Sequence, residues 1–217
     1  GNSLTIVDTV MISSLGEASV AAVGIAGRLQ FLFVLITFGF YSGAGIFMAQ
    51  YFGSRNFERM RVTMALQLVL GIMSSAVFMT VALVFPRWYM SIFSKDPQVI
   101  ELGIGYLKYL GWGFGMHAIS YAYIVSLRSI RDSLYPMYVS AIALIANTVL
   151  NYGLIFGNFG LPQLGVEGAA IATTISRFIE AGFMIYSVYF GSRFVLRAKL
   201  EDFRNIEASF LSRYFKI

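Results

Sequence analysis

One stretch, PMYVSAIALIANTVLNYGLIFG at residues 136–157, constrains this chain more than any other. It is long and apolar enough to cross a bilayer, yet it carries Asn147 and Asn151 four residues apart. On a helix that spacing places both amides on one face. An amide that faces hydrocarbon without a partner is costly, so we expect this face to meet other polar groups inside a helical membrane protein.

Composition supports a membrane setting and excludes several function classes. Hydrophobic residues make up 58% of the chain and charged residues 12%, and the mean hydropathy is +0.72. The chain has no cysteine and one histidine, which argues against a disulfide framework and against a transition-metal site. It contains no nucleophile elbow, phosphate loop or catalytic triad, so the sequence predicts no enzyme. The basic residues lie between and after the apolar runs, which favours membrane orientation over nucleic-acid binding.

The apolar runs predict an all-α, polytopic membrane protein built from one bundle of six transmembrane helices. The first run, residues 4–14, is shorter than the roughly 20 residues of a full span, so we expect the chain to begin partway through its first helix. The other runs cover residues 20–52, 62–85, 98–127, 136–157 and 166–190. Residues 1–190 thus form the predicted lobe, and residues 191–217 form a predicted amphipathic connector that lies on the membrane and leads toward a second lobe.

Two glycines in the second run, Gly39 and Gly43, have the GxxxG spacing. In membranes this spacing is typical of helices that pack closely, because glycine lets two backbones approach each other. We therefore predict a tight helix contact at these glycines.

Basic residues divide the connections into two groups. Cations concentrate in the connection after the second run, in the connection after the fourth run and in the tail, as Arg55, Arg59, Arg61, Arg128, Arg131, Arg193, Arg197, Lys199, Arg204, Arg213 and Lys216. By the positive-inside rule this group of connections is cytoplasmic. The sequence thus predicts a multi-pass protein of the inner (plasma) membrane with a cytoplasmic amino terminus and a cytoplasmic tail.

Counting residues from the outer end of each run places several polar side chains at one level of the membrane. The set that lies roughly 9–12 Å below the outer interface, at a rise of about 1.5 Å per residue, is Asp8, Tyr106, Asn151 and Thr173. Asn147 lies one turn deeper. A carboxylate in a membrane interior costs about 2.5–3.5 kcal/mol on insertion scales and is usually functional or partnered. Because carboxylate, amide and hydroxyl oxygens are hard ligands, these residues form a predicted site for Na⁺, or for H⁺ with Asp8 alone titrating.

Each of these residues also has an ordinary structural interpretation. Asp8 can make a helix–helix hydrogen bond, and the two asparagines can join helices without binding an ion. The Thr173 hydroxyl can bond its own helix, in which case Thr174 takes its place, and Tyr106 can be an interfacial aromatic. These alternatives stay open at the level of the sequence.

Other residues within the runs have predicted roles of their own. Arg177 and Glu180 are three residues apart in the sixth run, which predicts an ion pair within one helix, with a part in gating as the alternative. His117 is predicted to be a packed or hydrogen-bonded residue rather than a proton relay. Aromatic residues between Phe31 and Phe38 are candidates for lining a ligand cavity.

Five segments, taken in order along the chain, resemble successive signatures of a known family. They are VDTVMISSLGEASVAAVGIAGRLQ, GAGIFMAQYFGSRN, LRSIRDSLYPMY, NTVLNYGLIFG and GVEGAAIATTIS. The family is that of the multidrug and toxic compound extrusion (MATE) transporters, of the NorM and DinF-like bacterial type, and the similarity is to their amino-terminal half. It covers nearly the whole chain.

This resemblance implies a lobe of six helices that pairs with a second, similar lobe to make a twelve-helix fold. Such proteins export small amphiphilic or cationic compounds across the lipid bilayer, exchanging them for Na⁺ or H⁺ by alternating access. No cofactor is implied other than this coupling ion. The family's amino-lobe cation site matches this chain residue by residue, at Asp8, Tyr106, Asn147, Asn151 and Thr173. Some members have Asp where this chain has Asn151, so Asp8 is the only acid of the site here.

Two other functions stay open. One is a flippase for a lipid or a lipid-linked saccharide from the same superfamily, which is expected to have a strongly basic cavity that these runs do not show. The other is a non-transporting lobe or subunit, which works only when it pairs with a second lobe or a second copy of the chain.

Overall fold

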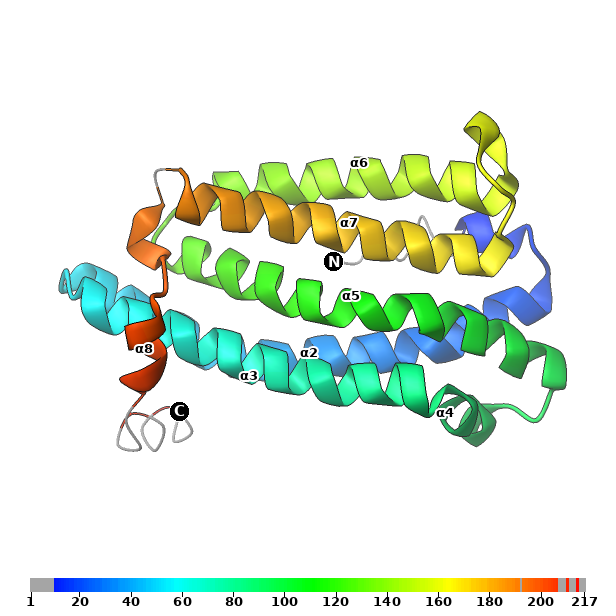
Figure 1. Ribbon diagram of the computed structural model, residues 1–217, viewed down its shortest axis with the longest axis horizontal. Helices are drawn as coiled ribbons and strands as arrows, with labels where there is room; N and C mark the ends of the chain where they lie inside the picture. The colour runs from blue at the N-terminus through cyan, green and yellow to red at the C-terminus, as the bar shows by residue number, and fades with distance from the viewer. Residues whose placement is uncertain (1–9, 192, 207–209, 211–213, 215–217) are drawn as a thin grey trace.

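The structure is a computed structural model that describes residues 10–191, 193–206, 210 and 214 (Figure 1). The described residues form helices and no strand. The long helices are α2 (Glu17–Gly53), α3 (Phe57–Val84), α5 (Pro97–Ser129), α6 (Leu134–Phe156) and α7 (Gly165–Tyr189). The short elements are α4 (Pro86–Phe93), α8 (Leu200–Arg204) and the 3₁₀ turns η1 (Asn158–Gly160) and η2 (Phe194–Leu196). The predicted all-α bundle is confirmed, and the long helices follow the predicted runs closely.

Proline and glycine set several helix ends. Pro86 is the first residue of α4 and Pro97 the first of α5, positions where the missing N–H would have no partner within the helix. The Asp96 carboxylate caps α5 by accepting a hydrogen bond from the Gln98 backbone N–H at 2.8 Å. Gly157 ends α6 in the left-handed conformation, with a φ of 76°. These ends are therefore fixed by local residues.

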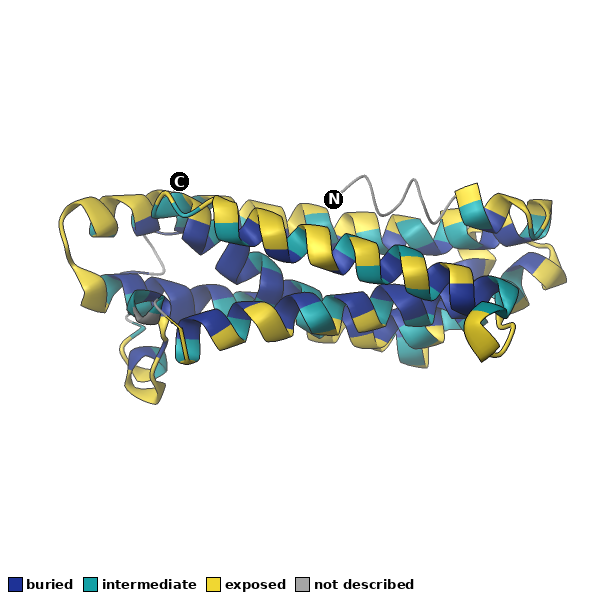
Figure 2. Cartoon of the chain, turned by 90° about the horizontal axis from the view of Figure 1, so that it is seen from above, coloured by how far each residue is buried: buried dark blue, intermediate teal, exposed yellow. Residues whose placement is uncertain are grey.

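Helix α5 is the centre of the bundle. It packs against α2, α3 and α7, and α6 packs mainly against α7 (Figure 1). The buried residues gather on the helix faces that point into the bundle, while the outer faces are largely exposed (Figure 2). Polar residues on the inner faces are thus shielded from the surroundings of the bundle.

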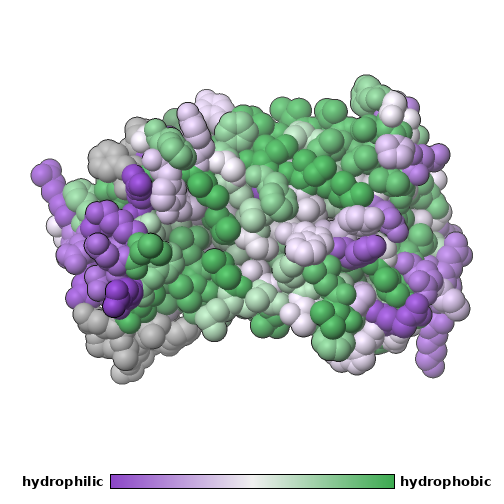
Figure 3. Space-filling model, in the orientation of Figure 1, coloured by the Kyte–Doolittle hydropathy of each residue, from purple (hydrophilic) through white to green (hydrophobic). Residues whose placement is uncertain are grey.

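The face of the bundle seen in Figure 3 is mostly apolar over its middle and polar at its two ends. Helices α2, α3, α6 and α7 are long and apolar enough to cross a membrane. Large apolar side chains are exposed along them, including Phe31 at 66%, Val77 at 62% and Ile145 at 64%. A surface of this kind is stable in contact with lipid rather than water.

The connections alternate between the two ends of the bundle (Figure 1). The α2–α3 connection, the α5–α6 connection and the described residues after α7 lie at one end, so the described basic connections are gathered there. Which end faces the cytoplasm stays a prediction.

The described part of the tail lies against the basic end of the bundle. The Arg61 Nε of α3 is 3.5 Å from the Asp202 Oδ2 of α8, and Asp202 is buried. The Arg193 Nε donates to the Asp132 Oδ2 at 2.6 Å. The tail is thus tied to this lobe by ion pairs, and its contact with the membrane stays a prediction.

Short helix α4 closes the opposite end. The buried Tyr89 hydroxyl donates to the Ile25 carbonyl of α2 at 3.1 Å. Burial raises the pKa of Tyr89, although the charge of nearby Arg28 acts in the opposite direction. The phenol therefore stays protonated and keeps donating at physiological pH.

The predicted close contact at Gly39 and Gly43 is wrong. Among the described residues, a Cβ atom at either glycine would meet nothing within 4 Å, because α2 turns a different face, with Phe33 and Tyr41, toward α5 and α3. The close approach lies elsewhere, at Gly168 of α7, where a Cβ would be 2.5 Å from the Leu154 carbonyl oxygen of α6. Glycine at that position brings α6 and α7 together.

Candidate functional site

The two asparagines of α6 meet a threonine of α7 in the interior of the bundle. The Asn151 side-chain N–H donates to the Asn147 Oδ1 at 3.2 Å, and the Asn147 side-chain N–H donates to the Thr173 Oγ1 at 3.3 Å. Both asparagines are fully buried, and Thr173 is 4% exposed. We call Asn147, Asn151 and Thr173 the amide cluster.

Local sequence and helix packing together produce this cluster. The i,i+4 spacing of the asparagines puts both amides on one face of α6. The contact at Gly168 lies five residues before Thr173, and it lets the two helix backbones approach closely enough for side chains to bond across the seam. The expectation that the polar face of α6 meets polar partners is confirmed.

Of the other predicted site residues, the structure describes Tyr106 but not Asp8. Tyr106 of α5 is 3% exposed and lies in the same buried cluster as Ile155 of α6 and Val166 of α7. Thr173 bonds Asn147, the asparagine expected to lie one turn deeper. Asp8 lies outside the described residues. A cation-binding role for all these residues stays a prediction.

Thr174 does not replace Thr173 in the amide cluster. Its hydroxyl donates to the Tyr109 carbonyl of α5 at 2.9 Å, so Thr174 points toward α5 rather than toward α6. The two adjacent threonines thus link α7 to α6 and to α5.

A second polar group lies in the interior, around Glu180 of α7. The Glu180 carboxylate accepts hydrogen bonds from Arg177 Nη1 at 3.0 Å, from the Ser120 hydroxyl of α5 at 3.2 Å and from the Ser140 hydroxyl of α6 at 2.9 Å. Its side chain is 5% exposed and that of Arg177 is 13% exposed. We call Arg177, Glu180, Ser120 and Ser140 the charged cluster.

The predicted ion pair within α7 is confirmed, but the two serines were not predicted. They come from helices that are 60 and 40 residues away in the sequence from Glu180. The sequence contained an indication for Ser140 alone, because Ser140 is seven residues from Asn147 and therefore shares its face of α6. One carboxylate thereby joins α5, α6 and α7.

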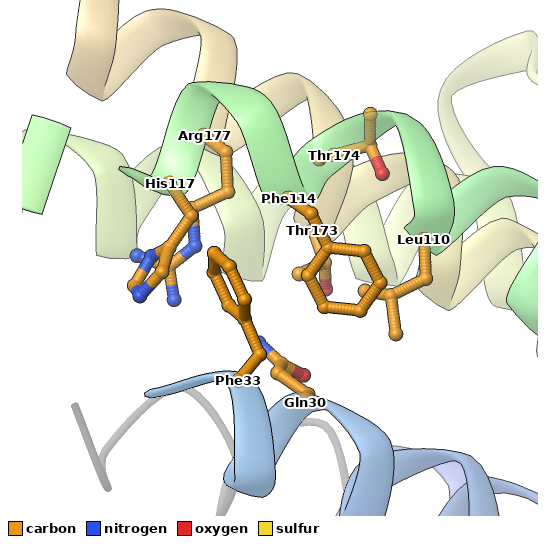
Figure 4. A pocket seen from close by; sticks show the side chains of 9 residues that line it. Gln30, Phe33, Leu110, Phe114, His117, Thr173, Thr174 and Arg177 are labelled. Atoms are coloured by element: carbon orange, nitrogen blue, oxygen red, sulfur yellow. The ribbon is translucent and has the colours of Figure 1, made fainter. Parts of the chain in front are cut away.

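A small pocket lies between the two clusters, and its volume of about 10 Å³ has room for about one water molecule (Figure 4). Thr173 of the amide cluster and Arg177 of the charged cluster both line it. Its other lining residues are Gln30, Phe33, Leu110, Gly113, Phe114, His117 and Thr174. Phe33 lies within the predicted aromatic segment, whereas the exposed Phe31 and Phe38 point away from the interior. The i,i+4 spacing of Thr173 and Arg177 indicates that both side chains lie on the same face of α7, which forms one wall of the pocket.

His117 is enclosed by aromatic rings at the edge of the pocket. Its ring stacks on Tyr121, with centroids 5.8 Å apart and an interplanar angle of 13°, and lies 5.7 Å from the Phe33 ring. Within the part of the chain that the structure describes, neither buried ring nitrogen has a hydrogen-bond partner. The predicted packing of His117 is confirmed. Among the described residues, no group competes with a polar atom in the pocket for a hydrogen bond to its ring nitrogens.

With this geometry in place, comparison with known proteins gives the family. A family model described as MatE matches residues 2–153. The chain belongs to the MatE family. This MatE chain is 31% identical over 179 residues to the probable multidrug resistance protein YoeA of Bacillus subtilis, a match that covers 82% of the chain and 38% of YoeA. It is 28% identical over 194 residues to the probable multidrug resistance protein NorM of Thermotoga maritima, covering 89% of the chain and 42% of that protein.

Solved structures support the same fold for this MatE chain. The inward-facing conformation of a multidrug resistance MATE family transporter of the MOP superfamily matches with a TM-score of 0.87 at 22% identity, over 99% of this chain and 48% of that one. The outward-facing conformation of such a transporter matches with a TM-score of 0.87 at 21% identity, over 100% of this chain and 47% of that one. The described helices and these relatives make the chain an integral membrane protein whose similar proteins are transporters, not enzymes. The chain spans less than half the length of these relatives.

Proposed function

We propose that this chain forms one lobe of a secondary transporter that exports amphiphilic or cationic compounds in exchange for Na⁺ or H⁺. The multidrug resistance proteins among its relatives support export as the activity. In this proposal a second lobe of the same polypeptide, or a second copy, completes the transporter in the inner membrane. The basic end of the bundle and the tail face the cytoplasm.

The observation that carries the proposal is the buried, hydrogen-bonded amide cluster inside a bundle with an apolar surface. Asn147, Asn151 and Thr173 offer amide and hydroxyl oxygens to a hard cation at a depth where water is excluded. Polar groups of this kind in a membrane interior mark ion or substrate pathways. Asp8 and Tyr106 are the further proposed ligands, and the carboxylate of Asp8 supplies the charge.

The proposed mechanism works through the packing of α6 against α7. A cation bound at the amide cluster draws the Asn147 and Thr173 oxygens toward itself, which replaces the hydrogen bond between them. This changes the contact between α6 and α7 near Gly168 and so changes the shape of the adjacent pocket. The cation thereby favours one conformation of the lobe, and its gradient drives export by population shift.

The equal likeness to an inward-facing and an outward-facing structure supports a rigid-body form of alternating access. This half of the fold matches both with a TM-score of 0.87, so small shifts of its helices, such as a change at the α6–α7 contact, fit both states. The larger motion then lies between lobes.

Efflux of an ethidium-like dye from reconstituted vesicles tests the proposal. An imposed Na⁺ or pH gradient is expected to drive efflux by the full-length protein, and Asp8→Asn is expected to abolish that stimulation. Unaltered efflux by Asp8→Asn would exclude the proposed role of this residue. Transport of a labelled lipid without dye efflux would favour the flippase, and neither activity would favour a non-transporting lobe.

A further inference from the structure

We propose that the pocket between the two clusters is a binding site for one water molecule, which His117 of α5, Arg177 of α7 and Gln30 of α2 hold by hydrogen bonds. The inference goes beyond the proposed export function and does not depend on it. It concerns a polar contact among three helices that needs no coupling ion and no second lobe.

The size of the pocket fits a single water molecule. A buried site needs about 10–15 Å³ to hold one water, and the volume here is about 10 Å³. An organic ligand with a ring, or an ion that keeps its hydration shell, needs several times this space. The occupant is therefore a molecule of the size of water.

His117 indicates that the occupant is polar. Both of its ring nitrogens are buried, and among the described residues neither has a hydrogen-bond partner. Buried polar groups are nearly always paired, either with protein or with ordered water. A neutral imidazole has one nitrogen that donates and one that accepts, and water can pair with either because it both accepts and donates.

Arg177 and Gln30 complete the set of partners (Figure 4). The nitrogen atoms of His117 and Arg177 lie at one end of the pocket, and the Gln30 amide approaches from α2. The bond from Arg177 Nη1 to Glu180 uses one of the five N–H groups of a guanidinium, so others remain for a water oxygen. A buried water typically makes about three hydrogen bonds, and these three residues can supply them.

Charge argues against a bare cation of similar size in the same place. Arg177 lines the pocket, whereas the carboxylate of its partner Glu180 also accepts from Ser120 and Ser140 and does not line it. Within the described residues the pocket wall thus carries a cation and no carboxylate. A second positive charge would meet Arg177 at low dielectric constant, where repulsion between like charges is strong. Neutral water, which accepts from Arg177, fits this wall.

The proposed water gives α2 a hydrogen-bonded contact with α5 and α7. Thr173 lines the same pocket, so the water also lies beside the amide cluster. A bond through water is nearly as favourable as a direct bond. If the helices shift, the polar side chains of the pocket can keep a partner by exchanging bonds with the water, so none is left buried and unpaired.

Solid-state NMR of the full-length protein in lipid vesicles, with ¹⁵N-labelled histidine, tests for the water. Magnetisation that starts on water protons should reach the ring nitrogens of His117, whose signal is identified by its loss in His117→Phe. Absence of this transfer in the native protein would overturn the proposal.

A density map that resolves ordered waters gives an independent measurement on the native protein. It should show one peak at about 2.7–3.2 Å from a ring nitrogen of His117. A map that resolves other internal waters but shows no peak at this place would refute the site.

Two glycine variants of α5 assign the transfer to this pocket. Gly113 lines the pocket, and in Gly113→Ala the new Cβ would lie 3.3 Å from the Oγ1 of Thr174, another lining residue. The methyl group is expected to displace the water, so transfer to His117 should be lost. The matched control is Gly115→Ala, whose Cβ would lie 4.0 Å from the Ser75 Oγ, outside the lining residues, and it should keep the transfer. Full transfer in Gly113→Ala would show that water reaches the ring by another route and would overturn the assignment.

Discussion

The amide cluster and the charged cluster share the seam between α6 and α7 but differ in their hydrogen bonds. Thr173 and Glu180 are seven residues apart on α7, as are Asn147 and Ser140 on α6, so the clusters lie about 10 Å apart along the helices. Glu180 has three partners on three helices, one of them charged, at 2.9–3.2 Å. The bonds that the described residues make within the amide cluster are neutral, at 3.2 and 3.3 Å.

This difference indicates that the charged cluster is a structural lock, that is, a group that holds α5, α6 and α7 together, whereas the amide cluster is a site that can exchange its bonds. Hydrogen bonds to charged groups are stronger than neutral ones, and a buried carboxylate that loses its partners is costly. Neutral amide bonds are exchanged more easily for bonds to an ion. We therefore expect the charged cluster to set stability and the amide cluster to set ion binding.

The largest expected effect is loss of the Glu180 carboxylate. Glu180→Ala leaves Arg177, whose side chain is only 13% exposed, without its partner, and breaking a buried pair costs about 3–5 kcal/mol. Thermal unfolding in detergent should show a clearly lower transition temperature. The double variant Arg177→Gln/Glu180→Gln should recover most of the loss, and a single variant as stable as the native protein would contradict the lock.

Removal of the Asn147 amide should affect ion binding more than stability. Asn147→Ala deletes the residue that bonds both other members of the amide cluster, and the apparent affinity for the coupling ion should fall about tenfold or more. Its unfolding free energy should fall by only about 1 kcal/mol, since hydrogen bonds between membrane helices are weak. Gradient-driven efflux measured against ion concentration gives the apparent ion affinity, and denaturant unfolding gives the unfolding free energy. If the ion dependence of efflux is unchanged in Asn147→Ala, the amide cluster does not set ion binding.

A methyl group at Gly168 should disturb the seam that both clusters share. In Gly168→Ala the new Cβ meets the Leu154 carbonyl, so α6 and α7 must separate, at a cost of about 1–3 kcal/mol. Gly39→Ala is the matched control, because its Cβ meets no described residue within 4 Å. Equal unfolding temperatures of the two variants would argue against a close contact at Gly168.

The smallest effect is expected at the exposed ion pair between Arg87 and Glu101. Their side chains are 67% and 61% exposed, and such pairs contribute about 0–1 kcal/mol. Arg87→Gln should therefore leave thermal unfolding nearly unchanged, in contrast to the buried pair. A large loss would show that exposure does not distinguish the two pairs.

The sequence by itself determined the helices and the polar face of α6. Proline at positions 86 and 97 and glycine at 157 act on the backbone within one turn, and the spacing of Asn147 and Asn151 fixes their shared face. These are local effects, which the residues decide wherever the helix lies. The ion pair of Arg177 and Glu180 was predictable for the same reason.

Only the tertiary structure decided which helices these side chains meet. Successive residues of a helix are turned by about 100°, so the orientation of α2 about its axis decides that a Cβ at Gly39 or Gly43 meets no described residue, and the offset of α7 pairs Thr173 with Asn147. The bonds from Ser120 and Ser140 to Glu180 depend on three helices packed around one point. Rotation and offset follow from the packing of whole helix surfaces, which no short pattern in one helix contains.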